Sequence, residues 1–275
     1  MCENLKWQSI TNRDKTLQEL LTLAKFSVVM PIHNEEKLLS YSLPSIFRLV
    51  PDEIILIFDR CTDKSLEIAE QITKRHEYGS RTRFIELNES SQRWRFRVAF
   101  LRRHGFKLAK NHVILNTDAD NLLDEKIADH LHFIGKKNIG IVMFSRIPHP
   151  KTLQSFVGTL ASRFLPTVGF GGLYAFSKEA WAETENQESA RNTPRAEDTH
   201  LRLSISKKFN EIFIRTETLH MRPKETAKYH FKKGITRWQA KRAPFFAVLV
   251  HSLLFLRPLV LCGYLKARLQ NRELI

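Results

Sequence analysis

Carboxylates occur in pairs directly after three apolar stretches of this 275-residue sequence. The pairs are Glu35 and Glu36, Asp59 and Asp63, and Asp118 and Asp120. Carboxylates held close together repel and raise one another's pKa unless a cation lies between them. Oxygen ligands suit Mg²⁺ or Mn²⁺, and Mg²⁺ is commonly bound together with phosphate groups. If the pairs converge, they therefore predict a divalent cation that bridges to a diphosphate.

Strands and helices alternate in the elements that must bring these acids together. Strands are expected at 26–30, 53–58, 83–87, 112–116 and 139–144. Helices are expected from residue 35, where Pro44 must kink or split the helix, and at 64–74, 97–109 and 126–133. This alternation predicts an α/β fold with a mainly parallel central sheet flanked by helices. The carboxyl ends of parallel strands share one edge, so the acids should meet in one crevice.

The pattern is looser outside this core. The expected elements are a leader helix at 17–24, a helix at 153–164, the Gly-rich stretch VGFGGLYAF at 168–176, a polar loop at 183–194, a helix at 198–207 and a strand at 211–216.

Some of the polar side chains also have a purely structural explanation. Asp63 is expected to be the N-cap of the helix that begins at Lys64, and Asp118 and Asp198 also stand where a capping residue is favoured. His220 fits either a further metal ligand or a structural histidine.

Four motifs, taken in order, resemble those of family 2 glycosyltransferases of the GT-A fold. They are VVMPIHNEEKLL (28–39), IILIFDRCTDKSLEIA (54–69), NTDADNLLD (116–124) and RAEDTHLRLSI (195–205). The resemblance implies an inverting transfer of a sugar from a nucleotide diphosphate sugar to an acceptor hydroxyl. Within the second motif, Arg60 and Cys61 replace the customary Gly and Ser.

The resemblance also assigns roles to individual residues. On the donor side, Pro31, His33 and Glu35 line the base and ribose pocket, Asp59 binds the base, and Asp118 contacts ribose or metal. Asp120, with His220 as the further candidate, binds the Mg²⁺ or Mn²⁺ that neutralises the leaving diphosphate. Asp198 is the general base that takes the proton of the acceptor.

Two basic segments add further donor contacts to this assignment. Arg102 is expected to contact the donor, whereas Arg97 and Arg103 on the same helix are expected to be solvated. The stretch KKGITRWQAKR (232–242) partly resembles the QxxRW motif of processive relatives, which places Arg237 at the diphosphate. Gly234 stands where that motif has Gln, so processive polymerisation is not expected.

Charge is concentrated at the C-terminal end of the chain. Of the net charge of +15, +12 lies from Leu201 onward, where 16 Lys and Arg stand against 4 Glu and no Asp. A basic amphipathic segment and apolar tail (222–275) follow the catalytic domain (26–221) and the leader (1–25). The apolar stretch 243–265 contains His251 and Arg257 and is broken by Pro258, so two short helices are expected.

The tail suggests where the protein works. We expect it to be peripheral on the cytoplasmic face of an anionic membrane, with a lipid-linked or polysaccharide acceptor. Packing of the tail on the catalytic domain or on a second subunit is the alternative. Cys2, Cys61 and Cys262 form no CxxC motif, and the N-terminal residues MCENLKWQSITNRDK contain no apolar h-region, so a cytoplasmic setting is expected.

Other functions remain open on the sequence alone. A nucleotidyltransferase on a similar fold would use the same metal chemistry, and a basic protein that binds nucleic acid or a membrane surface would need no catalysis. No nucleic-acid motif is present, so nucleic acid is not expected as a partner. The sugar, the nucleotide, the acceptor and the oligomeric state are not predicted.

Overall fold

A computed structural model describes residues 25–88, 97–149, 170–185, 197–221, 226–239 and 243–270. The expected leader helix and the helix at 153–164 lie outside these ranges, as does most of the polar loop at 183–194.

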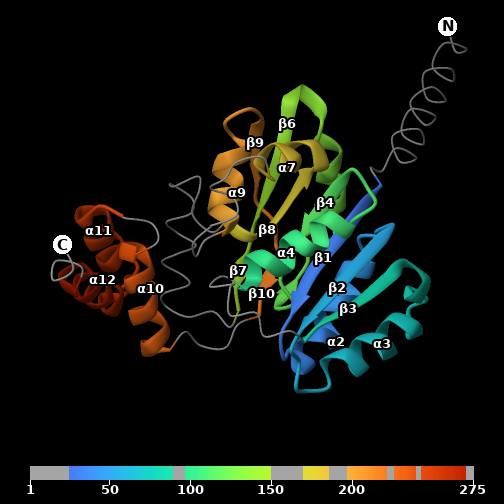
Figure 1. Ribbon diagram of the computed structural model, residues 1–275, viewed down its shortest axis with the longest axis horizontal. Coiled ribbons are helices and arrows are strands. Elements are labelled where there is room, and N and C mark those ends of the chain that lie inside the picture. Colours follow the sequence, from blue (N-terminus) through green and yellow to red (C-terminus); the bar gives the residue numbers. More distant parts are fainter. Residues whose placement is uncertain are drawn as a thin grey trace, which may run out of the picture.

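A seven-stranded sheet forms the centre of the molecule, in the order β3-β2-β1-β4-β8-β6-β9 (Figure 1). Its strands are β1 (Phe26–Ile32), β2 (Glu53–Asp59), β3 (Thr82–Leu87), β4 (Val113–Asn116), β6 (Ile139–Ser145), β8 (Phe170–Ser177) and β9 (Asn210–Ile214). Only β8 among them runs antiparallel to its neighbours, β4 and β6. The predicted mainly parallel α/β sheet is confirmed, and β8 occupies the Gly-rich stretch to which the sequence assigned no strand.

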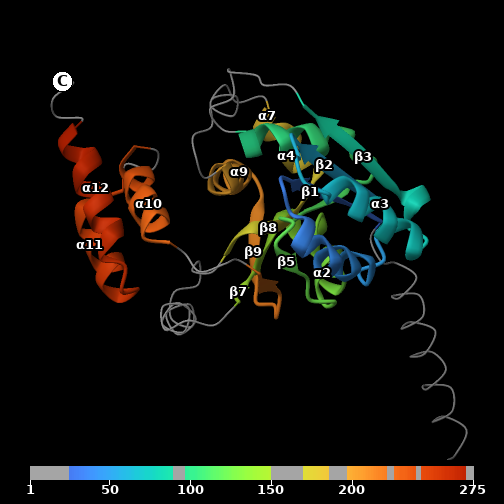
Figure 2. The same ribbon diagram turned by 90° about the horizontal axis from the view of Figure 1, so that it is seen from below.

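Helices cover both faces of this sheet (Figure 2). One face packs on α2 (Glu36–Phe47) and α3 (Ser65–Arg75), and the other on α4 (Arg97–Leu108), α7 (Lys178–Glu185) and α9 (Glu197–Ile205). Successive β1 residues pack on opposite faces of the sheet. Val28 belongs to the first apolar cluster and Val29 to the second. Strands buried on both faces are continuously apolar, as expected for a parallel sheet. Helix α2 continues through Pro44, so of the kink or split expected at this proline, the split does not occur.

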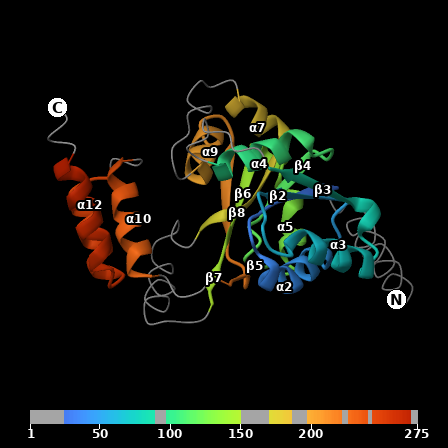
Figure 3. The same ribbon diagram turned by 60° about the horizontal axis from the view of Figure 1, so that its bottom comes forward.

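Short elements complete the part of the chain that surrounds the sheet. They are η1 (Gly79–Arg81), α5 (Ile127–His130), η2 (Leu131–Phe133), η3 (Lys136–Asn138), β5 (Asn121–Leu122), β7 (Ile147–Pro148) and β10 (Leu219–His220). The last three strands form a second small sheet in the order β5-β10-β7, beside the carboxyl end of β4 (Figure 3). Its register sets His220 opposite Asn121.

Three C-terminal helices stand to one side of the sheet in all three views (Figures 1 to 3). They are α10 (Ala227–Gln239), α11 (Phe245–Leu254) and α12 (Pro258–Gln270). The two short helices expected in the apolar tail are thus present as α11 and α12. Within the described ranges, every helix is too short or too polar to cross a bilayer.

Helices α10 and α12 cross with their backbones in contact. A Cβ added at Gly234 would lie 2.0 Å from the carbonyl oxygen of Val260, and one added at Gly263 would lie 2.0 Å from that of Phe231. Only glycine fits at such a crossing. Trp238 packs edge-on against Tyr264 beside it, with ring centroids 5.6 Å apart.

Candidate active site

The loops after β1 and β2 are joined by hydrogen bonds at the carboxyl edge of the sheet. His33, which is exposed, donates from Nδ1 to the backbone oxygen of Asp59 at 2.6 Å. The N–H of Glu35 donates to the hydroxyl of Ser65 at 2.8 Å. Pro31 lies in β1 directly before this loop. The structure therefore sets His33 against Asp59, while Glu35 contacts the first residue of α3 and Pro31 pairs with Ile57 of β2.

Asp63 ties the beginnings of two helices together. Its carboxylate accepts the N–H of Ser65 in α3 at 3.0 Å and the N–H of Glu36 in α2 at 3.1 Å. Burial opposes ionisation of Asp63, but the hydrogen-bond donors outweigh it, so the pKa of the carboxyl lies below its ordinary value. Helix α3 begins at Ser65 and its N-cap residue is Lys64, so Asp63, the expected cap, lies one residue before that position and joins α2 to α3 through these contacts.

Asp59, at the end of β2, is buried between two guanidinium groups. Its Oδ1 lies 3.0 Å from Arg60 and 2.8 Å from Arg97. Burial opposes ionisation of Asp59, but both cations favour it, so the pKa of this carboxyl is lowered. The expectation that Arg97 is solvated is wrong, since its side chain is only 15% exposed. Arg60 has φ +46°, a left-handed conformation that favours the glycine customary at this position.

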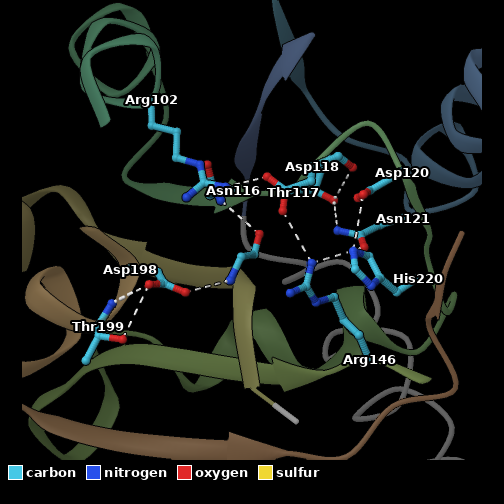
Figure 4. A network of polar contacts seen from close by, with 11 residues as sticks. Arg102, Asn116, Thr117, Asp118, Asp120, Asn121, Arg146, Asp198, Thr199 and His220 are labelled. Carbon is cyan, nitrogen blue, oxygen red and sulfur yellow. Dashed lines mark hydrogen bonds and ion pairs between the residues drawn. The ribbon is translucent and has the colours of Figure 1, made fainter. Parts of the chain in front are cut away.

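Asp118, which follows β4, is also held by two arginines (Figure 4). Arg102 from α4 pairs with its Oδ1 and has a side chain that is only 5% exposed. Arg146, the first residue after β6, lies 3.3 Å from its Oδ2 and donates to Asn121 Oδ1 at 3.4 Å. Two fixed positive charges therefore stand around Asp118.

Asp120 and His220 form a second polar group a few residues farther along the same edge (Figure 4). Asp120 Oδ2 lies 3.2 Å from His220 Nε2, and the Asp120 side chain is buried. The two residues meet because β10 pairs with β5 and because the Met221 N–H donates to the Asp120 carbonyl at 2.7 Å. His220 therefore lies beside Asp120, a position that fits a metal ligand and a structural histidine alike.

Asp198 reaches the site from the first turn of α9. Its Oδ1 accepts the N–H of Thr199 at 2.7 Å, and its Oδ2 accepts the N–H of Gly172 at 3.2 Å. The carbonyl of Gly172 in turn accepts from the buried Asn116 Nδ2 at 3.0 Å. One backbone residue of β8 thus connects Asp198 to the end of β4 (Figure 4).

Gly172 has space for no side chain. Its φ is +70°, and an added Cβ would lie 2.6 Å from Asp118 Oδ2 and 3.0 Å from Arg146 Nη1. A Cβ at Gly171 would lie 2.9 Å from Asp198 Oδ2. Asp118 and Asp198 therefore both approach Gly172.

A divalent ion is compatible with part of this arrangement. Within the described ranges, no three His, Cys, Asp or Glu side chains are grouped to hold a metal. Asp120 Oδ2 and His220 Nε2 are nevertheless separated by 3.2 Å, a spacing that two ligands of one ion can have when each bond is about 2.1 Å. Mg²⁺ is often held by one or two carboxylates, with substrate phosphates completing its shell. This pair fits a metal, whereas the arginines at Asp118 repel one.

Arg237 does not join this group. Its Nη2 lies 3.0 Å from His251 Nε2, within the C-terminal helices. The prediction that Arg237 faces the diphosphate is therefore not supported by its position.

Sequence reasoning missed Arg146 and Gly172. A basic residue at the end of a buried strand was the available signal for Arg146, because that position lies on the same edge as the acids. For Gly172 the pair of glycines was visible, but its partners lie 54 and 26 residues away along the chain, at Asp118 and Asp198.

The sheet order, the antiparallel β8 and the acids at the carboxyl edge define a GT-A domain. The mannosyltransferase PcManGT from Pyrobaculum calidifontis, in complex with GDP-Man and Mn²⁺, is similar with a TM-score of 0.59 at 20% identity, over 88% of this chain and 73% of that one. S. aureus TarS in complex with UDP-GlcNAc has a TM-score of 0.52 at 16% identity, over 78% of this chain and 67% of that one.

Glucosyl-3-phosphoglycerate synthase from Mycobacterium tuberculosis, with Mn²⁺, UDP and phosphoglyceric acid, is a third similar structure. Its TM-score is 0.50 at 16% identity, over 80% of each chain. At these identities the likeness concerns the fold. No curated protein matches the chain in sequence.

The family follows from the sequence itself. The model of glycosyl transferase family 2 matches residues 27–169, which is more than half of the chain. The chain belongs to glycosyl transferase family 2, and its class is that of the glycosyltransferases. Membership of this family favours a glycosyltransferase over the nucleotidyltransferase and the basic binding protein that the sequence left open.

Proposed function

We propose that the protein transfers a sugar from a nucleotide diphosphate sugar to an acceptor hydroxyl, with inversion at the anomeric carbon. The observation that carries this proposal is the approach of both Asp118 and Asp198 to Gly172 of β8. Residues suited to a donor and a residue suited to deprotonate an acceptor thereby lie in one site.

The nucleoside is assigned to the carboxyl ends of β1, β2 and β4. Asp59 and the loop with Pro31, His33 and Glu35 form the base side. We assign Asp118 to a ribose hydroxyl rather than to the metal, because Arg102 and Arg146 surround it with positive charge. A carboxylate has about four lone-pair sites, so two guanidinium groups leave capacity for a hydroxyl.

The diphosphate is assigned to the space near Asp120. Asp120 and His220 would hold a divalent ion, which would neutralise the charge that develops on the leaving diphosphate. The nitrogen ligand makes Mn²⁺ the better candidate, since Mg²⁺ takes oxygen ligands almost exclusively. Arg146 and Arg102 add fixed positive charge in the same region, and guanidinium groups bind phosphate oxygens in pairs.

Asp198 is assigned as the general base. Two backbone N–H groups, of Thr199 and Gly172, fix the orientation of its carboxylate. In a single displacement the acceptor oxygen attacks the anomeric carbon opposite the leaving group, while Asp198 takes its proton. A single displacement inverts the configuration of that carbon.

A panel of UDP- and GDP-sugars tests the proposal. Each is added to the protein with Mn²⁺ or with EDTA, and a donor that binds only the folded state raises the melting temperature. The best donor is then incubated with candidate acceptors, and the anomeric proton coupling of the product is read by NMR. An inverted product supports the proposal. A product with retained configuration, or thermal shifts that are the same in Mn²⁺ and in EDTA, contradicts it.

A further inference from the structure

The outer face of α11 carries a stripe of exposed apolar side chains. We call Phe246, Val250, Leu253 and Leu254 the α11 stripe; they recur at i, i+4, i+7 and i+8, which is one side of a helix. Phe246 is 72% exposed and Leu253 is 68% exposed. Scattered single apolar residues are normal on a protein surface, but a continuous stripe marks an interaction surface.

The opposite side of α11 is buried against α12. Val248 is fully buried in a small core with Val260 and Tyr264 from α12. Tyr264 also donates its hydroxyl to the Ala243 carbonyl at 2.8 Å. Helix α12 thus holds α11 in place from behind, while the α11 stripe faces outward.

Basic side chains flank α11 at both ends. At its beginning, the Arg268 guanidinium lies 6.0 Å from the ring of Phe245. Beyond its end, the Arg257 guanidinium lies 6.0 Å from the ring of Phe255, and Arg237 meets His251 in its last turn. From residue 226 to residue 270 the sequence has nine Lys and Arg and neither Asp nor Glu. The surroundings of the α11 stripe are therefore positively charged.

We infer that the α11 stripe docks on an anionic lipid membrane, with the stripe among the acyl chains and the flanking basic residues at the phosphates. Interfacial helices combine an apolar face of this kind with Lys and Arg. The 10 residues of α11 span about 15 Å, which suits a helix lying in the plane of the interface rather than across it. Each basic residue near anionic lipid adds about 1 kcal/mol of attraction.

The same charges argue against a second copy of the chain as the occupant. Two copies that met at this face would bring 18 basic side chains of residues 226–270 together without an acid from these segments. Like charges across an interface are unfavourable, so the positive charge selects an anionic partner. The docking does not depend on the proposed donor, metal or base, and it adds a location to the proposed reaction.

Vesicle flotation of the full chain tests this inference. The vesicles contain either phosphatidylcholine alone or equal parts of phosphatidylcholine and phosphatidylglycerol. The wild type should float with the anionic vesicles and much less with the neutral ones. The double variant Phe246→Ser/Leu253→Ser should lower the partition coefficient by about 100-fold, because each large apolar side chain contributes about tenfold or more.

A matched control removes apolar surface elsewhere. Tyr41 on α2 and Leu203 on α9 are 59% and 50% exposed, and Tyr41→Ser/Leu203→Ser should bind vesicles as the wild type does. Equal melting temperatures of the two double variants show that the stripe variant is folded. A wild type that stays unbound, that binds neutral vesicles equally well, or that binds no better than the stripe variant overturns the inference. So does a wild-type dimer in ultracentrifugation that the stripe variant dissociates, because the occupant is then a second copy.

Discussion

Gly172 offers the sharpest test of how the site is built. Its replacement by Ala introduces two separate penalties. The backbone at φ +70° disfavours a residue with a Cβ, at about 1–2 kcal/mol. The new Cβ also lies 2.6 Å from Asp118 Oδ2, where ordinary contact begins at 3.4 Å.

The second penalty, the close contact with Asp118, lowers the rate of the reaction. Asp118 must move by a distance on the order of 1 Å, and a displacement of that size costs about 100-fold in rate. We therefore expect Gly172→Ala to lower turnover of the best sugar nucleotide about 100-fold. Its thermal unfolding should show a loss of at least about 1–2 kcal/mol.

Two other glycines separate the two penalties. Gly135 has φ +86° with nothing within 4 Å of an added Cβ, so Gly135→Ala should lose about 1–2 kcal/mol of stability and no activity. Gly79 has open space and no left-handed φ, so Gly79→Ala should leave both unchanged or gain about 0.4–1 kcal/mol. Turnover of Gly172→Ala equal to that of Gly135→Ala would refute the reasoning, because the close approach to Asp118 would then have no effect.

Three further predictions concern other groups. Asp120→Ala should abolish transfer and remove the Mn²⁺-dependent part of UDP or GDP binding in calorimetry, as should His220→Ala; unchanged Mn²⁺ dependence would show that the ion binds elsewhere. Asp198→Asn should lower turnover by about two to four orders of magnitude while donor binding persists, and near-normal turnover would leave Asp198 as a structural residue only. Burial, together with nearby cations, lowers the pKa of His251 to about 3, so the unfolded chain binds a proton below about pH 6.5 that the folded chain does not. The stability of the C-terminal helices should therefore fall as the pH drops from 6.5 toward 3, which Trp238 fluorescence can follow in a variant whose other tryptophans are Phe. The substitution His251→Gln should remove this fall. If wild type and His251→Gln respond alike, His251 is not the responsible group.

The central sheet was predictable because most of its strands coincide with short apolar stretches of the sequence. β1, β2 and β4 each fall on a stretch that the sequence marks, within one or two residues at either end. β8 was not recognised, because its two glycines hide the alternation and its neighbours β4 and β6 lie far away in the sequence. A local apolar pattern therefore predicts a regular strand better than it predicts a strand that contains glycines.

The acids of the site were predictable, but their partners were not. Asp59 was assigned correctly to the end of a strand, while Arg97 was expected in solvent although it lies 2.8 Å from that acid. Arg97 and Asp59 are 38 residues apart in the sequence, so no local pattern indicates that they form an ion pair. Arg237 was expected at the diphosphate because a short motif matched, but the helix that carries this motif packs elsewhere.

The crossing of α10 and α12 also limits how this chain can change over evolutionary time. Gly234 occupies the place of the first residue of the QxxRW motif, and any larger side chain there would meet the Val260 carbonyl at 2.0 Å. A single substitution to Gln would therefore force the two helices apart. A descendant of this chain could acquire that motif only after its C-terminal helices had been repacked, so the geometry of a helix pair restricts which sequences this chain can reach.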